Sequence, residues 1–262
     1  MEASAPEEPA VRVTPGAAIT TAWFWLLFAV TAPICLLLGT LIFLFTLPFD
    51  RDRRAIHAFI CRWTFLYLRA SPLWRAEVRG RERLPPGPAV LVANHQSMAD
   101  VVAAMGLFHP YKFVSKASLF SVPVVGWLMR MAKYVRLERG SPGSTRRMME
   151  ACRNWLRRGM PVLIFPEGTY SGGRGLLDFK RGAFALAMEE HVPVVPVVLK
   201  GTAQLIRGDG PFVNARSDIQ VEVLEPISPA QFGENPDELA RRVRALFEAA
   251  LAEPGVTGGS QR

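Results

Sequence analysis

A long uncharged stretch near the N-terminus dominates the hydropathy pattern of this chain. Residues 21–47, TAWFWLLFAVTAPICLLLGTLIFLFTL, contain no charged side chain. About 20 apolar helical residues cross the hydrocarbon core of a bilayer, so the stretch is long enough to span one. Pro33 falls in its middle and predicts a kink, because proline lacks the backbone donor of a helix. The segment can therefore span the membrane or bend and lie in one leaflet.

The charges around the apolar stretch predict its orientation. Arg51, Arg53 and Arg54 follow it, whereas only Arg12 precedes it. The positive-inside rule then places the C-terminal part of the chain in the cytoplasm. The leader is rich in glutamate and lacks the basic start of a signal peptide, so we do not expect cleavage. Residues 1–20, rich in Ala, Pro and Glu, are expected to form a disordered tail.

The segment that follows mixes aromatic and basic side chains. Residues 52–69 predict a second helix, in which Trp63 and Tyr67 lie among arginines. Such a mixture is typical of the lipid headgroup level, although a helix packed into the protein core is an open alternative. We expect residues 21–70 to form a membrane anchor.

From about residue 73 short apolar runs alternate with polar segments. The runs that predict strands are Ala89–Ala93, Lys112–Val114, Pro161–Phe165, Val194–Leu199 and the alternating residues 219–223. The prolines around the run at 194–199 favour a sheet edge or a strand start.

Two helices are predicted among these strands. One covers residues 144–158 with Ser144 as its cap, and one begins near the C-terminus with Asn235 as its cap. We therefore predict an α/β domain over residues 71–253, with a central mixed β-sheet flanked by helices. Residues 254–262 are expected to form a flexible tail.

Composition points to an anionic partner at a membrane. The chain has a net charge of +8, 50% hydrophobic residues and a mean hydropathy of +0.16. Because the positive charge is spread along the chain, it favours a membrane-facing domain over a nucleic-acid-binding arm. Three cysteines without a CxxC pair and four histidines without HExxH spacing predict no zinc site and no disulfide framework.

A polar motif directly follows the strand predicted at residues 89–93, and it reads NHQSMAD over residues 94–100. A histidine acts as a general base when a carboxylate fixes one of its ring nitrogens, and Asp100 could serve His95 in this way. Residues five apart on one helix point about 140° apart, so they could not meet there. The pair requires His95 in a loop and Asp100 in the first turn of the next helix.

A second motif, Phe165–Thr169, follows another predicted strand. Its Pro-Glu-Gly sequence predicts a tight turn whose backbone N–H groups could bind an anion. Basic residues are found near both motifs in the sequence: Lys116, Arg136, Arg139, Lys180 and Arg181.

The order and spacing of these segments resemble the PlsC-like family of lysophospholipid acyltransferases over roughly residues 75–225. The four matching blocks are Asn94, His95 and Asp100; Val135–Arg139, with Glu138 where the family has Asp; Phe165–Thr169 with Ser171; and Val192, Pro193, Pro196 and Val197.

The resemblance implies transfer of a fatty acyl group from acyl-coenzyme A or acyl carrier protein to the hydroxyl of a lysolipid. The acceptor would most simply be 1-acyl-sn-glycerol-3-phosphate, giving phosphatidic acid at the cytoplasmic face of the inner membrane. It further implies that His95 is the general base and that Asp100 orients it. An apolar channel would hold the acyl chain, and no cofactor, metal or nucleic acid is expected. The acceptor-binding residues that it implies are Asn94, Lys116, Arg139, Glu167, Gly168, Thr169 and Tyr170.

One position departs from the family pattern. Tyr170 stands where the family has an arginine that binds phosphate. Tyrosine brings no charge, and a charge-assisted hydrogen bond is roughly twice as strong as a neutral one. Either another cation compensates, with Arg174 and Arg181 nearby in sequence, or the acceptor is a lyso-ornithine lipid or a lysophosphodiester.

Two other functional classes remain as alternatives. A membrane hydrolase would use Ser97 with His95 and Asp100, but the chain lacks a GxSxG motif. A non-catalytic membrane scaffold would keep the apolar anchor without needing the ordered polar blocks.

Overall fold

The computed structural model describes residues 14–69, 74–206, 212–214 and 216–253. Within them one seven-stranded sheet has the strand order β1-β7-β6-β2-β5-β3-β4. The strands are β1 (Trp74–Arg79), β2 (Val90–Ala93), β3 (Lys112–Lys116), β4 (Val135–Leu137), β5 (Val162–Ile164), β6 (Val194–Lys200) and β7 (Ser217–Val223). All neighbouring pairs are parallel except β6 and β7. The prediction of a mixed sheet is therefore confirmed.

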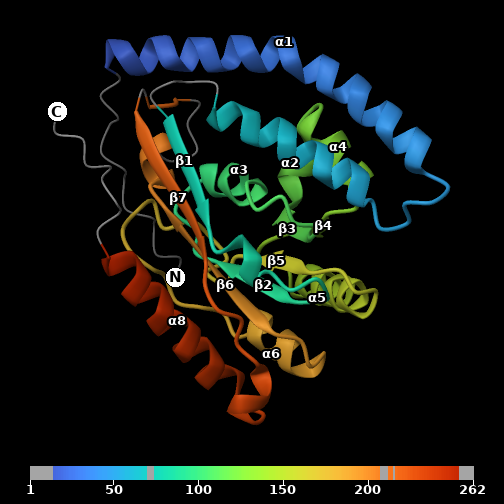
Figure 1. Ribbon diagram of the computed structural model, residues 1–262, viewed down its shortest axis with the longest axis vertical. Coiled ribbons are helices and arrows are strands. Elements are labelled where there is room, and N and C mark those ends of the chain that lie inside the picture. Colours follow the sequence, from blue (N-terminus) through green and yellow to red (C-terminus); the bar gives the residue numbers. More distant parts are fainter. Residues whose placement is uncertain (1–13, 70–73, 207–211, 215, 254–262) are drawn as a thin grey trace.

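Helices cover both faces of this sheet (Figure 1). The α-helices are α1 (Pro15–Thr46), α2 (Arg54–Leu68), α3 (Ala99–Met105), α4 (Val125–Met131), α5 (Pro142–Arg157), α6 (Gly182–Glu189), α7 (Thr202–Leu205) and α8 (Pro236–Ala252). The described part of the chain also contains three short 3-10 helices, η1 (Arg81–Arg83), η2 (Ala117–Ser121) and η3 (Pro229–Phe232). One core forms where α2, α3 and α4 pack on the sheet, and α5, α6 and α8 form a second core on the opposite face.

Strand β6 lies inside the sheet, between β7 and β2, so of the two predicted positions the sheet edge was wrong, whereas Pro193 directly precedes the strand start at Val194. Pro196 is tolerated there because it falls between the regular Val197–Val223 pair and the isolated Val194–Ile227 bridge. The ladder to β7 is irregular at this point, and the Pro196 carbonyl still accepts a bond from the Leu224 N–H. Irregular positions of this kind accommodate a residue that has no N–H donor.

The N-terminal helix α1 lies across the top of the α/β domain, beside α2, and bends partway along its length (Figure 1). Pro33 lies inside it, as the predicted kink requires. The helix begins at Pro15, capped by Thr14, so residues 15–20, which were expected in a disordered tail, are helical. Residues 1–13 and the predicted tail at 254–262 lie outside the described residues.

The two faces of α1 have different neighbours, although both are apolar. Phe24, Leu27 and Phe28 pack against the core that α2 helps to form. The opposite face is exposed, and its large apolar side chains are Leu26, Val30, Ile34, Leu37, Leu41 and Phe45. The helix is long and apolar enough to cross a membrane, and only 11% of its most apolar window is buried.

Helix α2 packs through buried polar contacts as well as apolar ones. His57 is buried, its Nδ1 lies 2.7 Å from the Tyr134 hydroxyl, and its Nε2 lies 2.9 Å from the His109 carbonyl oxygen. A carbonyl only accepts, so Nε2 carries the proton and the Tyr134 hydroxyl donates to Nδ1. Burial lowers the pKa of His57 to about 4, and the neutral ring satisfies both contacts.

The stability of the protein is therefore expected to fall in mild acid. Between pH 6.5 and about 4 the unfolded chain binds a proton at His57 that the folded chain does not, which costs up to roughly 3 kcal/mol. We expect His57→Gln to lose less thermal stability than the wild type over this range in detergent. Parallel pH profiles for the two proteins would contradict this assignment.

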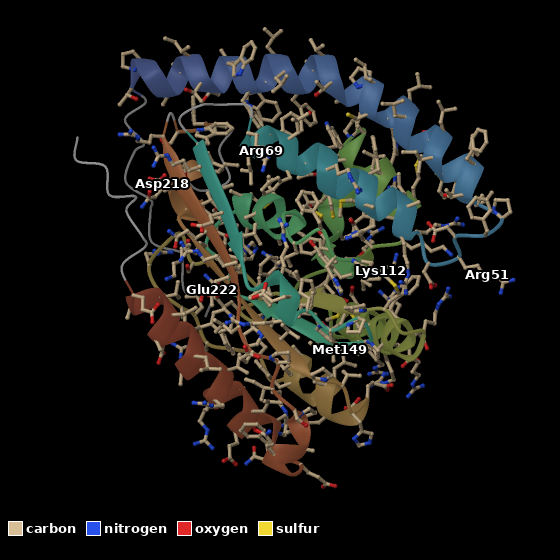
Figure 2. All side chains as sticks on the ribbon, viewed as in Figure 1. Arg51, Arg69, Lys112, Met149, Asp218 and Glu222 are labelled. Carbon is tan, nitrogen blue, oxygen red and sulfur yellow. The ribbon has the colours of Figure 1, made fainter. Side chains whose placement is uncertain are left out.

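Lys112 connects the turn between α1 and α2 to the domain beneath it (Figure 2). Its buried ammonium donates to the carbonyl oxygens of Asp52, at 2.6 Å, and Ala132, at 2.7 Å. It also lies 4.5 Å from the centre of the Trp155 ring. Burial lowers the pKa of Lys112 to about 7, against the opposing effect of Asp52. The helix pair is thus attached to the domain by specific polar contacts.

Both predicted helices are present, although one predicted cap was wrong. Helix α5 begins at Pro142 and is capped by Ser141, three residues before the expected cap. The Ser144 hydroxyl instead accepts the backbone N–H of Glu138 at 2.9 Å. Asn235 caps α8 as predicted, because its side chain accepts from the N–H groups of Asp237 and Glu238.

Candidate functional site

His95 and Asp100 form a buried pair at the carboxyl end of β2. His95 lies in the loop after that strand, and Asp100 lies in the first turn of α3. This is the arrangement that the five-residue spacing requires. The His95 Nδ1 lies 2.7 Å from the Asp100 Oδ2, and both residues are buried. Because the carboxylate accepts the proton on Nδ1, the Nε2 atom remains as the basic nitrogen.

Backbone groups fix the carboxylate of Asp100. Its Oδ2 also accepts the N–H of Gln96 at 2.5 Å and the N–H of Ser97 at 2.8 Å. The imidazole of His95 stacks on Phe165, with ring centres 4.1 Å apart and planes 14° from parallel. Stacking fixes the plane of the ring and the hydrogen bond fixes its rotation, so the base is held in one orientation.

Glu167 supports the loop that carries His95. Its Oε1 accepts the N–H of His95 at 2.7 Å, and its Oε2 accepts the N–H of Leu177 at 2.8 Å. Burial raises the pKa of Glu167, while these two N–H donors partly offset that effect. Both carboxylate oxygens bind backbone, so this residue connects the two motif loops and does not line the cleft described below.

Asn94 has a similar supporting position. Its side chain donates to the Leu199 carbonyl oxygen at 2.9 Å and accepts the Leu199 N–H at 2.7 Å. The amide thereby continues the pairing of β2 with β6 beyond the end of β2. The structure places neither Asn94 nor Glu167 where the sequence analysis expected a substrate contact.

The support from Glu167 leads to a prediction for Glu167→Gln. A glutamine oxygen can replace only one of the two carboxylate acceptors, and its NH₂ group would face the other backbone donor. We expect a loss of about 1–3 kcal/mol of stability, together with lower activity as the His95 loop shifts. Thermal unfolding and the rate of acyl transfer check this, with the exposed Glu82→Gln as the matched control. Equal behaviour of the two variants would contradict it.

A cleft of about 590 Å³ opens in front of His95. Three cations line it, Lys116 from the end of β3, Arg139 after β4 and Lys180 before α6, and all three are exposed. The lining includes no aspartate or glutamate. Gly168, Thr169 and Tyr170 complete the wall beside His95. The cleft therefore provides a positive surface for an anionic ligand next to a basic nitrogen.

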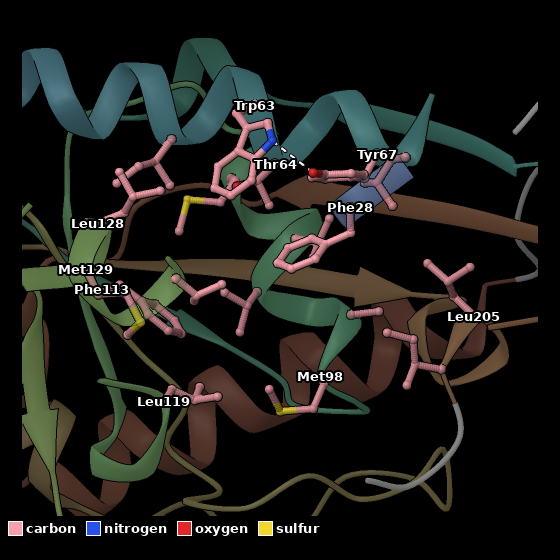
Figure 3. A pocket seen from close by; sticks show the side chains of 18 of the residues that line it. Phe28, Trp63, Thr64, Tyr67, Met98, Phe113, Leu119, Leu128, Met129 and Leu205 are labelled. Carbon is pink, nitrogen blue, oxygen red and sulfur yellow. Dashed lines mark hydrogen bonds between the residues drawn. The ribbon is translucent and has the colours of Figure 1, made fainter. Parts of the chain in front are cut away.

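An apolar cavity of about 230 Å³ lies behind the cleft, between the helices and the sheet (Figure 3). Phe28 of α1, Trp63 of α2 and Leu128 of α4 contribute to its wall. The cavity and the cleft share five lining residues, namely Met98, Val101, Phe113, Ser115 and Leu119. An apolar chain attached to a polar group in the cleft would thus find an apolar compartment next to it.

The other basic residues that are close to the two motifs in sequence do not line this cleft. Arg181 lines a separate groove between α6 and η3, and Arg136 pairs with Glu138 at 2.9 Å. The Arg174 Nε donates to the Ser171 carbonyl oxygen, and this residue does not line the cleft. The sequence predicted Lys180 only as a basic residue near the motifs. Its position in the cleft depends on the path of the loop that precedes it, which the sequence does not determine.

Comparison with known proteins agrees with this architecture. Residues 75–200 match the family model described as Acyltransferase. A 1-acyl-sn-glycerol-3-phosphate acyltransferase of Pseudomonas aeruginosa is 31% identical, covering 82% of this chain and 93% of that protein. A lyso-ornithine lipid O-acyltransferase of the same bacterium is 32% identical, covering 73% of this chain and 78% of that protein.

A chloroplast 1-acyl-sn-glycerol-3-phosphate acyltransferase of Brassica napus is 36% identical over 76% of this chain, which spans 57% of that longer protein. Among solved structures, the 1-acyl-sn-glycerophosphate acyltransferase PlsC of Thermotoga maritima superposes with a TM-score of 0.71 and 26% identity. The superposition covers 89% of this chain and 94% of that one. The chain belongs to the acyltransferase family that contains the 1-acyl-sn-glycerol-3-phosphate acyltransferases.

Proposed function

We propose that this protein transfers a fatty acyl group from an acyl thioester to the free hydroxyl of 1-acyl-sn-glycerol-3-phosphate, which gives phosphatidic acid. The observation that carries the proposal is the buried His95–Asp100 pair at a cleft that is lined by cations and adjoins an apolar cavity. The cations suit the phosphate, the cavity suits an acyl chain, and the base lies near both.

The reaction needs one proton carrier and no acyl-enzyme, because a thioester is already activated. The His95 Nε2 takes the proton of the acceptor hydroxyl while the hydroxyl oxygen attacks the thioester carbonyl carbon. Asp100 stabilises the imidazolium that forms. The tetrahedral intermediate collapses with cleavage of the carbon–sulfur bond, and the leaving thiolate takes the proton from His95. The histidine is then neutral again and ready for another turnover.

The charge of the cleft favours a phosphate monoester over the alternative acceptors. A phosphate monoester carries between one and two negative charges at neutral pH, and three cations without a carboxylate can bind it. A lyso-ornithine lipid carries an ammonium group as well as a carboxylate, and the ammonium would meet these cations without a counter-charge. A lysophosphodiester would bring a single negative charge.

The hydrolase alternative finds no support in the position of Ser97. Its buried hydroxyl donates to the Thr202 carbonyl oxygen at 2.9 Å and accepts the N–H of Ala99 at 3.1 Å. Both contacts fix the start of α3, and the hydroxyl is directed to the backbone. A nucleophilic serine would instead have to donate to His95.

Helix α1 belongs in the membrane, and its contacts favour a position along one leaflet. Thr21 exchanges hydrogen bonds with Val213, and Gly39 lies so close to α4 that a Cβ there would be 2.7 Å from Leu128. These two positions are about 27 Å apart along the helix. A helix attached to the domain at both ends cannot cross the bilayer unless the domain enters it too. An N-terminal tag accessible from the same side as the domain is expected, and a tag on the opposite side would show a spanning helix.

A panel of acceptors tests the proposed function. The purified protein would receive labelled acyl-coenzyme A or acyl carrier protein with lysophosphatidic acid, a lysophosphodiester or lyso-ornithine lipid. We expect the fastest transfer to lysophosphatidic acid. Transfer confined to another acceptor would replace the proposed substrate and keep the chemistry, and no transfer with any pair would refute the proposed function.

A further inference from the structure

A further groove lies beside the cleft, along the strand that ends the sheet. This β4–α5 groove has a volume of about 480 Å³ and lies between β4 and α5 (Figure 1). On α5, Thr145 and Met148 line the cleft. Their neighbours Ser144 and Arg147 line the β4–α5 groove. The start of α5 thus forms a common rim between the two hollows, and a ligand can extend from one into the other.

The charges of the β4–α5 groove favour an anion. Three cations line it, Lys133, Arg136 and Arg147, against a single carboxylate. That carboxylate, on Glu138, pairs with Arg136 at 2.9 Å. Lys133 and Arg147 are exposed, and within the described residues no ion pair involves either of them. Two positive charges are therefore available to a bound anion.

The surface beyond the groove does not share this excess of positive charge. Farther along α5, Arg153 pairs with Glu189 at 2.6 Å, and Arg157 pairs with Glu190 at 2.8 Å. An acidic protein would need a broad complementary face, because a typical protein–protein interface buries about 800 Å² on each partner. Unpaired cations within a groove instead suit a small anionic ligand.

The position of the groove relative to His95 matches the length of an acyl donor. His95 follows β2, and β4 lies three strands away in the sheet, which is about 14 Å. In acyl-coenzyme A, a pantetheine arm of about thirteen bonds separates the sulfur from the nearest phosphate, as long as four extended residues, or roughly 14 Å. A thioester held at His95 would thus place the phosphates of its donor at β4.

The groove also has room for the part of coenzyme A beyond the arm. Its lining follows α5 from Ser144 to Trp155, a distance of about 16 Å along the helix. Trp155 and Tyr134 add aromatic surface to the lining. An adenine base has an apolar ring face that such surface suits.

We propose that the β4–α5 groove binds the phosphorylated nucleotide of acyl-coenzyme A, with Lys133 and Arg147 on its phosphates. This inference rests on the proposed function and names the donor. The pantetheine arm lies in the cleft, and the thioester carbonyl lies at His95. Because the nucleotide is remote from the reacting bond, losing its contacts acts mainly on the KM for the donor and less on kcat.

Variants of the two free cations test the assignment at saturating lysophosphatidic acid. Removing a charged hydrogen-bond partner in Arg147→Gln is expected to raise the KM for acyl-coenzyme A roughly tenfold, with a larger rise when Lys133→Gln is added. The matched control is Arg146→Gln, because Arg146 is exposed and lines neither the cleft nor the groove. The control should stay within about twofold of the wild type.

A truncated donor shows whether the lost contact is to the nucleotide. S-acyl pantetheine keeps the arm and the thioester but has no phosphate and no base. With this donor, the kcat/KM of the double variant should differ from that of the wild type by less than about twofold, because there is no phosphate to contact. A loss as large as with acyl-coenzyme A would refute the inference, since the two cations would then act elsewhere.

The remaining outcomes separate this inference from the proposed function. If the wild type uses acyl-coenzyme A and the double variant keeps its KM, the groove is not the donor site and the proposed function stands. An equal loss in Arg146→Gln would indicate general surface charge and would also refute the groove. Transfer from acyl carrier protein alone would exclude the nucleotide and leave the proposed function intact. No transfer to lysophosphatidic acid from any donor would refute both together.

Discussion

His95→Ala is expected to lower kcat for acyl transfer by roughly a hundredfold to ten-thousandfold, the usual contribution of a general base. The physical reason is that no other described residue at this position combines a basic nitrogen with a carboxylate partner. The KM for the acceptor should change much less, because Lys116, Arg139 and Lys180 remain in the cleft.

Two further variants distinguish the loss of the base from a loss of folding. His95→Gln keeps a polar side chain of similar length between Phe165 and Asp100, and it should be as inactive as His95→Ala. His191→Asn alters an exposed histidine on a separate groove and should retain full activity. Substantial activity in a folded His95 variant would contradict the assigned base.

Asp100→Asn is expected to have the second largest effect. The Asp100 Oδ2 accepts three N–H groups, and a neutral amide oxygen in the same place would accept them more weakly. The imidazolium formed during the reaction would also lose its negative partner. We expect kcat to fall by roughly a hundredfold or more, with little change in KM.

The matched control for Asp100→Asn is Asp218→Asn, an exposed aspartate on β7 (Figure 2). It removes the same charge outside the cleft and should leave kcat unchanged. A similar loss in both variants would show that net charge, and not the contact with His95, determines the rate.

Short-range features of this protein were predictable because their causes are local. The NHQSMAD motif follows a buried strand, and its geometry allows His95 and Asp100 to meet only across a loop-to-helix junction. The apolar helix follows from similar reasoning, whereas of the two predicted caps only one was placed correctly. That one is the Asn235 cap of α8.

Long-range features were missed because no local pattern determines them. The partner of Asn94 is Leu199, 105 residues away, and the partner of Glu167 across the site is the backbone of His95. Asn94 and Glu167 were therefore predicted to bind the substrate, although their side chains bind backbone groups of neighbouring segments. The central position of β6 likewise depends on where the sheet ladder becomes irregular near Pro196.

Strand β4 and the position of Lys180 in the cleft were missed for related reasons. Strand β4 has three residues, and its middle position is occupied by Arg136, so its apolar pattern is too brief to recognise. Lys180 reaches the cleft only because the loop after Tyr170 returns to the turn at Pro166. Its neighbour Arg181 lines a different groove, and only the fold distinguishes the two cations.

The most direct test of the account is a comparison of acyl transfer to lysophosphatidic acid by purified wild type and His95→Ala, with labelled acyl thioester as donor. We expect formation of phosphatidic acid by the wild type and a loss of at least about a hundredfold in the variant, which should still unfold cooperatively. Comparable rates in the two folded proteins would contradict it, because the reaction would then proceed without the base on which the mechanism depends.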